Sequence, residues 1–312
     1  MHRFHNILFV SHGIRDETEA LQLAIKLASK NEAQLRILII GPPFPNALSE
    51  YKVSYEESLI DKMNKAIQLA KSKLKFSKKK IPIHIEVDSG ITPDIRIIRH
   101  VLINSHDLLI KAAETPEGMK GFKAIDMELL RKCPCALFLY RPLKHTLQDI
   151  RIAVAVDPKD EDPVAQDLSL YLLELSYSLN TLYQGKLSIL SCWELILENY
   201  LRDSVWIKIS EDELEKMIVE EQQAHDLLLR ELIKRSQIPG EYQIEHLKGQ
   251  PEEVIPSIIT HKKIDILVMG TVARTGISGF IIGNTAENIL QKIDCSLLAL
   301  KPLGFISPVN AY

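Results

Sequence analysis

Short apolar runs recur along the chain, separated by longer amphipathic stretches. The first half begins with such a run at residues 6–12, and the second half with one at residues 151–157. Continuous apolar runs of this length are typical of parallel strands that are buried on both faces. The remaining runs are residues 35–41, 83–87, 107–110 and 135–142 in the first half and 187–192, 242–247, 265–269 and 295–302 in the second. The two fifth runs match position for position at a spacing of 160, so the chain contains an internal repeat.

Helical patterns lie between the runs, for example at residues 18–29 and 214–233, where apolar residues follow a 3.6-residue period. Helices that alternate with buried strands predict βαβ crossovers. We therefore expect an α/β fold with two tandem, doubly wound, five-stranded parallel-sheet domains of Rossmann-like type, related by a pseudo-twofold. A polar stretch at residues 143–149 predicts domains at 1–145 and 146–312, and the chain length of 312 residues suits two domains.

Composition narrows the class of protein. The hydrophobic fraction of 46% and charged fraction of 25% are ordinary globular values. Lys+Arg 38 against Asp+Glu 41 gives a net charge of -3, which offers no general field for nucleic acid, so we expect none as a partner. We find neither a signal-peptide pattern nor an apolar stretch of the roughly 18–20 residues that a membrane span needs. A cytoplasmic protein is the expectation.

The loop after the fourth run of the second half carries the clearest chemistry. Glycines stand at 270, 276, 279 and 283, at the sheet edge where open parallel sheets bind ligands. Gly283, Asn284 and Thr285 then open a helix, whose first N–H groups favour an anion. The alternative is architectural, because Asn284 and Glu287 have the spacing of a capping box. The clustering of four glycines favours phosphate binding.

The loop and the repeat together resemble the universal stress protein family. Gly270 and Gly283 lie thirteen positions apart, as in the glycine motif of that family's nucleotide-binding members, and Asp157 stands at the matching end of the first strand. The resemblance covers both halves and is nearest to the tandem members of the E type. It implies an ATP or other adenine-nucleotide site, with Mg²⁺, in the C-terminal domain of a stress-response binding protein. The implied site residues are Asp157, Met269, Gly270, Ala273, Arg274, Gly283, Asn284 and Thr285.

Two of these positions depart from the family motif. Ala273 replaces its second glycine and adds a methyl group where backbone meets phosphate. Asn284 replaces its Ser/Thr, although Thr285 supplies a hydroxyl one position later. Arg274 is either a phosphate contact or an exposed loop residue.

The first half has lost the corresponding motif. Ala112 stands where the second half has Gly270, and His12 replaces the acidic residue found at Asp157. Glu114 and Glu117 put negative charge where phosphates would lie, which predicts repulsion. We expect a degenerate domain that serves as a partner for the second.

No Ser/His/Asp, Cys/His or HExxH pattern supports catalysis, so we expect a binding protein. A slow ATPase, and binding of an apolar or lipid-like ligand near Phe280–Ile281–Ile282, stay open as alternatives. Cys133 and Cys135 lack the spacing of a zinc site; packing is the favoured interpretation and redox sensing the alternative. The resemblance implies that the two fifth strands pair within the chain, as the fifth strands of single-domain members pair in dimers; their apolar character fits this, since an unpaired apolar edge promotes aggregation. Association of two chains and protein partners stay open.

Overall fold

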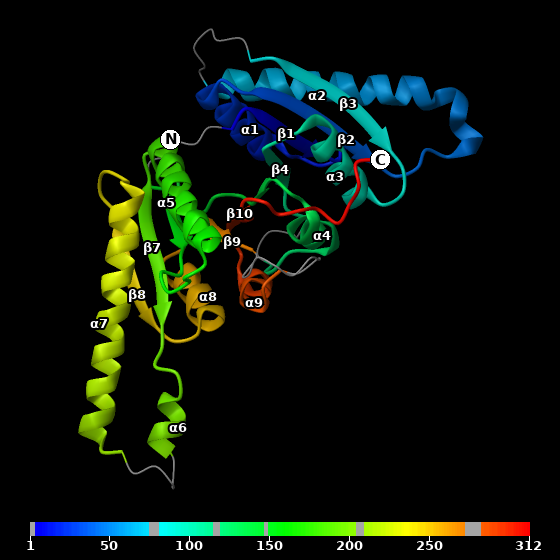
Figure 1. Ribbon diagram of the computed structural model, residues 1–312. Helices are drawn as coiled ribbons and strands as arrows, with labels where there is room; N and C mark the ends of the chain where they lie inside the picture. The colour runs from blue at the N-terminus through cyan, green and yellow to red at the C-terminus, as the bar shows by residue number, and fades with distance from the viewer. Residues whose placement is uncertain (1–3, 75–80, 115–118, 147–148, 204–208, 272–281) are drawn as a thin grey trace. The chain divides into compact units, whose positions relative to one another are not determined.

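The computed structural model describes residues 4–74, 81–114, 119–146, 149–203, 209–271 and 282–312. The described residues form two compact units. The N-terminal unit comprises residues up to Pro142 together with Ile282 and Ser296–Tyr312, and the C-terminal unit comprises residues 143–271 and Gly283–Cys295. Each unit is an α/β structure with strands between helices, which confirms the predicted fold class (Figure 1).

The N-terminal unit has the strand order β3-β2-β1-β4-β5. These five strands are parallel. The strands are β1 (Asn6–Ser11), β2 (Gln34–Gly41), β3 (Ile83–Ser89), β4 (Leu108–Ala112) and β5 (Ala136–Tyr140). The helices are α1 (Thr18–Asn31), α2 (Lys52–Lys73, after a 3-10 turn at Asn46–Tyr51), α3 (Pro93–Asn104) and α4 (Ala124–Lys132).

The C-terminal unit repeats this order as β9-β6-β7-β8, again with parallel pairing. The strands are β6 (Arg151–Ala155), β7 (Lys186–Trp193), β8 (Gln243–Lys248) and β9 (Ile266–Gly270). The helices are α5 (Pro163–Tyr183), α6 (Glu198–Asp203), α7 (Glu211–Ser236), α8 (Pro251–His261) and α9 (Asn284–Lys292). The recurrence of one strand order in both units matches the internal repeat of the sequence.

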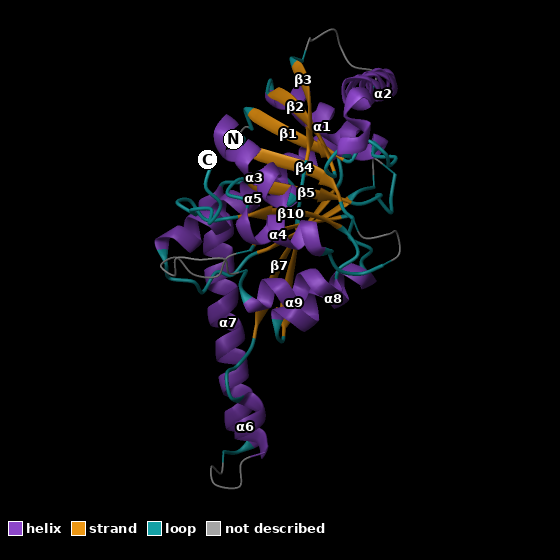
Figure 2. Cartoon of the chain, turned by 90° about the vertical axis from the view of Figure 1, so that its right-hand side faces the viewer, coloured by secondary structure: helices purple, strands orange, loops and turns teal. Residues whose placement is uncertain are grey.

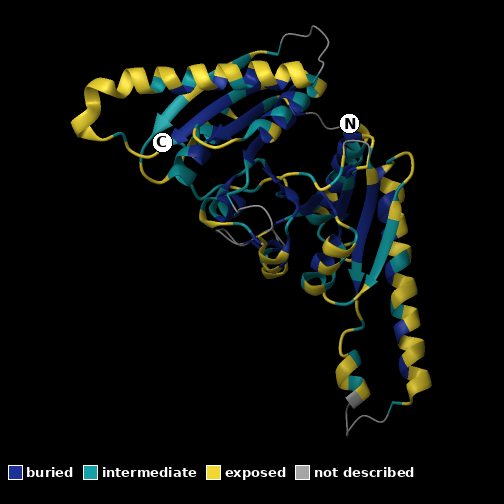
Figure 3. Cartoon of the chain, turned by 180° about the vertical axis from the view of Figure 1, so that it is seen from behind, coloured by how far each residue is buried: buried dark blue, intermediate teal, exposed yellow. Residues whose placement is uncertain are grey.

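Helices pack in pairs on the two faces of each sheet. α1 contacts α2 and α3 contacts α4 in one unit, and α5 contacts α7 and α8 contacts α9 in the other (Figure 2). Right-handed crossovers require this arrangement, because the connections run outward from the first strand in one direction and then in the other. The inner strands of each sheet are largely buried and the edge strands β3 and β8 are only partly so, whereas α2 and α7 are exposed over much of their length (Figure 3).

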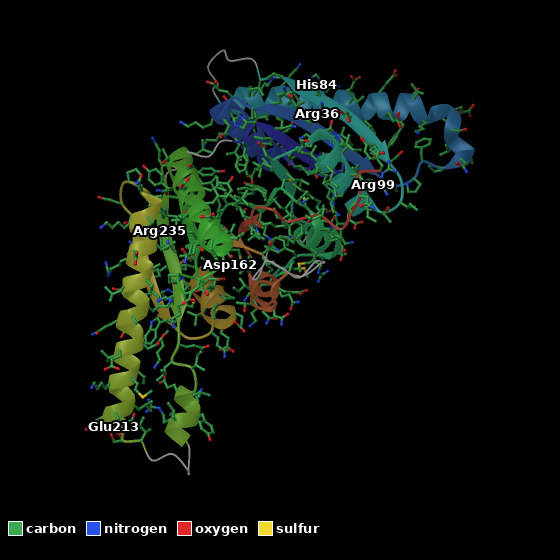
Figure 4. The ribbon with its side chains drawn as sticks, in the orientation of Figure 1. Arg36, His84, Arg99, Asp162, Glu213 and Arg235 are labelled. Atoms are coloured by element: carbon green, nitrogen blue, oxygen red, sulfur yellow. The ribbon has the colours of Figure 1, made fainter. Side chains whose placement is uncertain are left out.

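Local capping explains where two long helices begin. Asp162 precedes α5 and its carboxylate accepts a hydrogen bond of 2.9 Å from the Val164 N–H, with Pro163 at the first helical position. Ser210 and Glu213 form a reciprocal capping box at the start of α7. Asp162 and Glu213 are labelled at these helix starts in Figure 4.

The last strand, β10 (Ser296–Leu300), lies antiparallel to β5. Leu297, Leu298 and Ala299 are opposite Leu139, Phe138 and Leu137. The predicted pairing of the two apolar fifth strands is therefore confirmed, and β10 groups by its contacts with the N-terminal unit. Ser296 secures the strand end, since its hydroxyl donates to the Arg141 carbonyl at 3.0 Å and accepts from the Arg141 N–H at 2.8 Å.

Candidate functional site

The candidate site lies at the carboxyl ends of β6 and β9. β7 pairs with one side of β6 and β9 pairs with the other, while the chain runs from β6 directly to β7. The strand order therefore reverses between β6 and β9. A doubly wound sheet binds ligands at such a reversal, because the loops from the two strands diverge and leave a crevice. The sequence predicted this loop, and the topology confirms that it follows a strand at the reversal.

The predicted residues from β6 and β9 reach this edge together. In the register, Val154 is opposite Val268, so Asp157, two residues after β6, and Thr271, directly after β9, follow strands that end at the same edge. Asp157 is exposed, Met269 is buried, and Gly270 is the last residue of β9. Ala273 and Arg274 lie outside the described residues, as do Gly276 and Gly279.

The returning end of the loop begins helix α9. The Gly283 N–H donates to the Thr271 carbonyl at 3.0 Å, which joins the two ends of the segment between them. Gly283 is the N-cap residue of α9, and as a glycine it has no side chain with which to cap the helix. Asn284 and Thr285, its first two residues, are exposed. The first N–H groups of a helix have no partner within it, so an uncapped start attracts an anion.

The start of α9 differs from the capping box that the sequence offered as an alternative. Asn284 is the first residue of α9 and not its cap, so the capping-box alternative is not formed with Glu287. Neither Gly270 nor Gly283 has a positive φ, so the backbone conformation does not require a glycine at either position. A Cβ on Gly270 would lie 3.0 Å from Leu168 Cδ2, so Gly270 allows helix α5 to approach β9 closely.

Asp157 sits among groups that the sequence analysis did not connect with it. Its carboxylate accepts a hydrogen bond of 2.9 Å from the Lys159 N–H, and the Lys159 ammonium is paired with Glu221. Burial raises the pKa of the Cys192 thiol to about 11, and the Asp157 charge acts in the same direction. Burial also lowers the pKa of His225, an effect that Asp157 opposes. The sequence feature that could have identified Lys159 is its position two residues after Asp157, which is the spacing of an Asx turn.

The matching edge of the N-terminal unit contains the chain's own charges. Lys111, at the end of β4, is fully buried, and its ammonium lies 2.8 Å from an Asp126 carboxylate oxygen. Asp126 belongs to the first turn of α4, the helix equivalent to α9, and its second oxygen accepts from the Glu114 N–H at 2.8 Å. The Asp126 carboxylate thus lies at the start of α4, whereas the equivalent start of α9 in the other unit has exposed residues.

Glu114 does not present the free negative charge that the sequence suggested. Its carboxylate lies 3.4 Å from His12 Nε2 and 3.5 Å from the Lys111 ammonium. The His12 ring, with help from the Lys111 charge, lowers the pKa of Glu114 to about 2. Glu114 is therefore ionised and paired within the unit; Glu117 lies outside the described residues.

No described helix combines the length and the apolar character that crossing a membrane requires. Within the same described part of the chain, no group of three or more His, Cys, Asp or Glu side chains could hold a metal ion.

Comparison with known proteins shows which proteins the chain is similar to. Residues 151–301 match the Universal stress protein family. The Universal stress protein E homolog of Haemophilus influenzae is 27% identical over 326 aligned residues, which cover 96% of this chain and 98% of the relative. A universal stress protein from Archaeoglobus fulgidus has the same fold, with a TM-score of 0.61 and 14% identity over 96% of this chain and 97% of its own. A universal stress protein solved in complex with cAMP aligns with 50% of this chain and 98% of its own, at 16% identity and a TM-score of 0.34. Residues 151–301 thus form a universal stress protein domain, in a chain that is similar along its whole length to tandem universal stress proteins of the E type.

Proposed function

We propose that the C-terminal unit binds one adenine nucleotide, ATP with Mg²⁺, at the carboxyl ends of β6 and β9. The observation that carries the proposal is the start of α9. Its N-cap residue is a glycine, which has no side chain to cap the helix, its first two residues are exposed, and the Gly283–Thr271 hydrogen bond ties it to the end of β9. Backbone N–H groups at such a helix start stabilise phosphate without needing a lysine.

The described residues fit this ligand. Asn284 and Thr285 add side-chain donors beside the N–H groups of the first turn, and Asp157, just after β6, supplies a carboxylate on the same edge. Carboxylate oxygen is a preferred protein ligand of Mg²⁺ in nucleotide sites. By the family resemblance, the edge at Met269 and Gly270 faces the adenine, and Ala273 and Arg274 complete the loop.

The N-terminal unit supports a stoichiometry of one. Its corresponding helix start already has the Asp126 carboxylate, and the cation nearest to it, Lys111, is paired with that carboxylate. A phosphate approaching this edge would meet an internal anion whose charge is already balanced, so it gains little.

Isothermal titration of the full chain with Mg·ATP tests the proposal. We expect one site per chain, lost or weakened at least about tenfold (1.4 kcal/mol) in Asp157→Ala. His12→Ala, at the equivalent position of the first half, is the matched control and is expected to bind as the unaltered chain does. Absence of heat at high micromolar nucleotide, or two sites per chain, contradicts the proposal.

We propose binding as the function, in a cytoplasmic stress-response protein, and not catalysis. The slow ATPase stays a separate hypothesis, tested by phosphate release with and without Asp157. The apolar ligand also stays a hypothesis: of the three residues that suggested it, Ile282 is buried and the other two lie outside the described residues. A non-nucleotide adduct in native mass spectrometry of the purified protein would favour it.

A further inference from the structure

Two cysteine side chains of the N-terminal unit lie in contact. Cys133 Sγ and Cys135 Sγ are 3.5 Å apart, and both residues are free thiols. Cys133 is fully buried and Cys135 is partly exposed. The second half has Ile293 and Cys295 at the equivalent positions, so the pair is particular to the first half.

The backbone holds the two sulfurs near each other. Cys133 ends helix α4, and its N–H donates to the Leu129 carbonyl at 2.9 Å. Pro134 follows and restricts the backbone between the cysteines. Directly after Cys135, Ala136 begins β5 in register with Leu108. A helix end, a proline and a strand start therefore fix both sides of the pair, and they hold the two sulfurs 3.5 Å apart.

A lysine from the C-terminal end of the chain stands beside the thiols. The Lys301 ammonium donates to the Leu130 carbonyl at 2.6 Å in the last turn of α4, and lies over the Phe305 ring at 4.2 Å. Two further bonds keep the segment after β10 in place, Ser307 to the Lys132 carbonyl at 2.8 Å and Arg99 to the Asn310 carbonyl at 3.3 Å. Arg99 is labelled in Figure 4.

The charges are arranged to favour a thiolate on one sulfur. The hydrogen bond from Cys135 lowers the pKa of Cys133, and the Lys301 charge acts in the same direction. The same contact and burial raise the pKa of Cys135. One sulfur is thus the stronger acid, while its neighbour keeps its proton, which is the division between attacking and resolving thiols.

We propose that Cys133 and Cys135 form a reversible dithiol–disulfide site that reacts with hydroperoxides. The Cys133 thiolate attacks one peroxide oxygen; the S–O bond forms, the O–O bond breaks, and the leaving oxygen takes a proton and departs as water from hydrogen peroxide. Cys135 then attacks the sulfenic sulfur; the S–S bond forms, the S–O bond breaks, and the hydroxyl leaves as water with the Cys135 proton. Two thiols lose two electrons, and one peroxide is reduced to two waters.

Lys301 is a positioning residue in this proposal, because its charge favours the Cys133 thiolate without itself reacting. Partly exposed Cys135 and Lys301 mark the side from which a molecule little larger than water approaches. Cys295, buried at the equivalent position without a neighbouring sulfur from residue 293, provides an internal comparison.

Peptide mapping tests the site directly. The full chain is treated with hydrogen peroxide, quenched with N-ethylmaleimide under denaturing conditions and digested with trypsin. Because trypsin does not cut before proline, residues 133–144 form one peptide that contains both thiols, while Cys192 and Cys295 fall in peptides 187–202 and 293–312. We expect peroxide to convert the 133–144 peptide to a form that carries no maleimide and is two hydrogens lighter than the dithiol, before the peptides with Cys192 and Cys295 react. Reduction with dithiothreitol should restore labelling by two maleimides.

Variants separate the roles. Cys135→Ser should stop at a sulfenic acid on Cys133 that dimedone captures. Lys301→Gln should slow disulfide formation about tenfold and move the pH profile of Cys133 alkylation upward, by loss of the neighbouring positive charge. Lys132→Gln, whose ammonium pairs with Glu128 and Asp94, is the matched control and should leave the rate unchanged. Sulfinic acid as the main product, or earlier oxidation of Cys192 and Cys295, overturns the site; equal rates in the two lysine variants overturn the role of Lys301.

Discussion

The Lys111 ammonium lies 2.8 Å from an Asp126 carboxylate oxygen, and neither side chain has exposed surface. The pair joins the end of β4 to the first turn of α4. A buried charge that keeps its partner is tolerated, whereas one that loses it has neither water nor a counter-ion. The buried pair therefore stabilises the N-terminal unit at the same sheet edge where this unit has lost the ligand-binding motif.

We predict that Lys111→Met lowers the free energy of unfolding by about 3–5 kcal/mol, because it leaves the Asp126 charge buried and unpaired. Asp126→Leu should cost a similar amount. The double variant should cost clearly less than the sum, since an apolar pair removes both charges. Urea denaturation measures all three; additive losses would show that the two side chains do not act as a pair.

His106 should make stability depend on pH. Its ring is buried, its Nδ1 lies 3.2 Å from the Asn6 carbonyl, and burial lowers its pKa to about 4. Between pH 6.5 and pH 4 the unfolded chain binds a proton on this ring that the folded chain does not. The free energy of unfolding therefore decreases as the pH is lowered through that window. His106→Asn should remove about 2 kcal/mol of this loss, seen by urea denaturation at pH 7 and pH 5. Exposed His84 gives the control, His84→Asn, and an equal effect there would refute the assignment.

Gly270→Ala should lower the free energy of unfolding by about 1 kcal/mol, because the new Cβ would lie 3.0 Å from Leu168 Cδ2. Gly41→Ala, at the end of β2, is the control, since a Cβ there has no heavy atom within 4 Å. Thermal unfolding compares the two. Equal effects would show that packing against α5 does not require a glycine at 270.

Ala273→Gly should raise the affinity for Mg·ATP about tenfold, or 1.4 kcal/mol, by restoring the glycine of the family motif. The basis is the sequence, since residue 273 lies outside the described residues. Thr115→Gly, at the aligned position of the first half, should change nothing. Titration calorimetry compares the variants, and unchanged affinity in Ala273→Gly would remove the methyl group as an obstacle.

Much of the fold could be predicted because burial on both faces leaves a plain signature. The runs at 6–12 and 151–157 contain β1 and β6, and the run at 135–142 contains β5. The helix predicted at 214–233 is longer, Glu211–Ser236, because Ser210 caps it before the apolar pattern begins.

The buried polar residues of the first unit could not be predicted from the hydrophobic pattern. The predicted strand at 107–110 stopped short of Lys111, since a lysine is rarely buried. Its partner, Asp126, lies fifteen residues later in another element, so no local spacing connects them. Glu114 was found, but its pairing with His12 depends on how β1 and β4 lie side by side.

The pairing of β10 with β5 has a consequence for synthesis. The strand that covers the apolar edge of β5 is residues 296–300, which follow β6 to β9 in the chain and are therefore synthesised after them. Until then, a nascent chain whose first half has already folded carries an open strand edge of Leu137, Phe138 and Leu139. Truncated chains that lack β10 would keep this edge exposed. Because an exposed strand edge promotes aggregation, cellular quality control must recognise such chains.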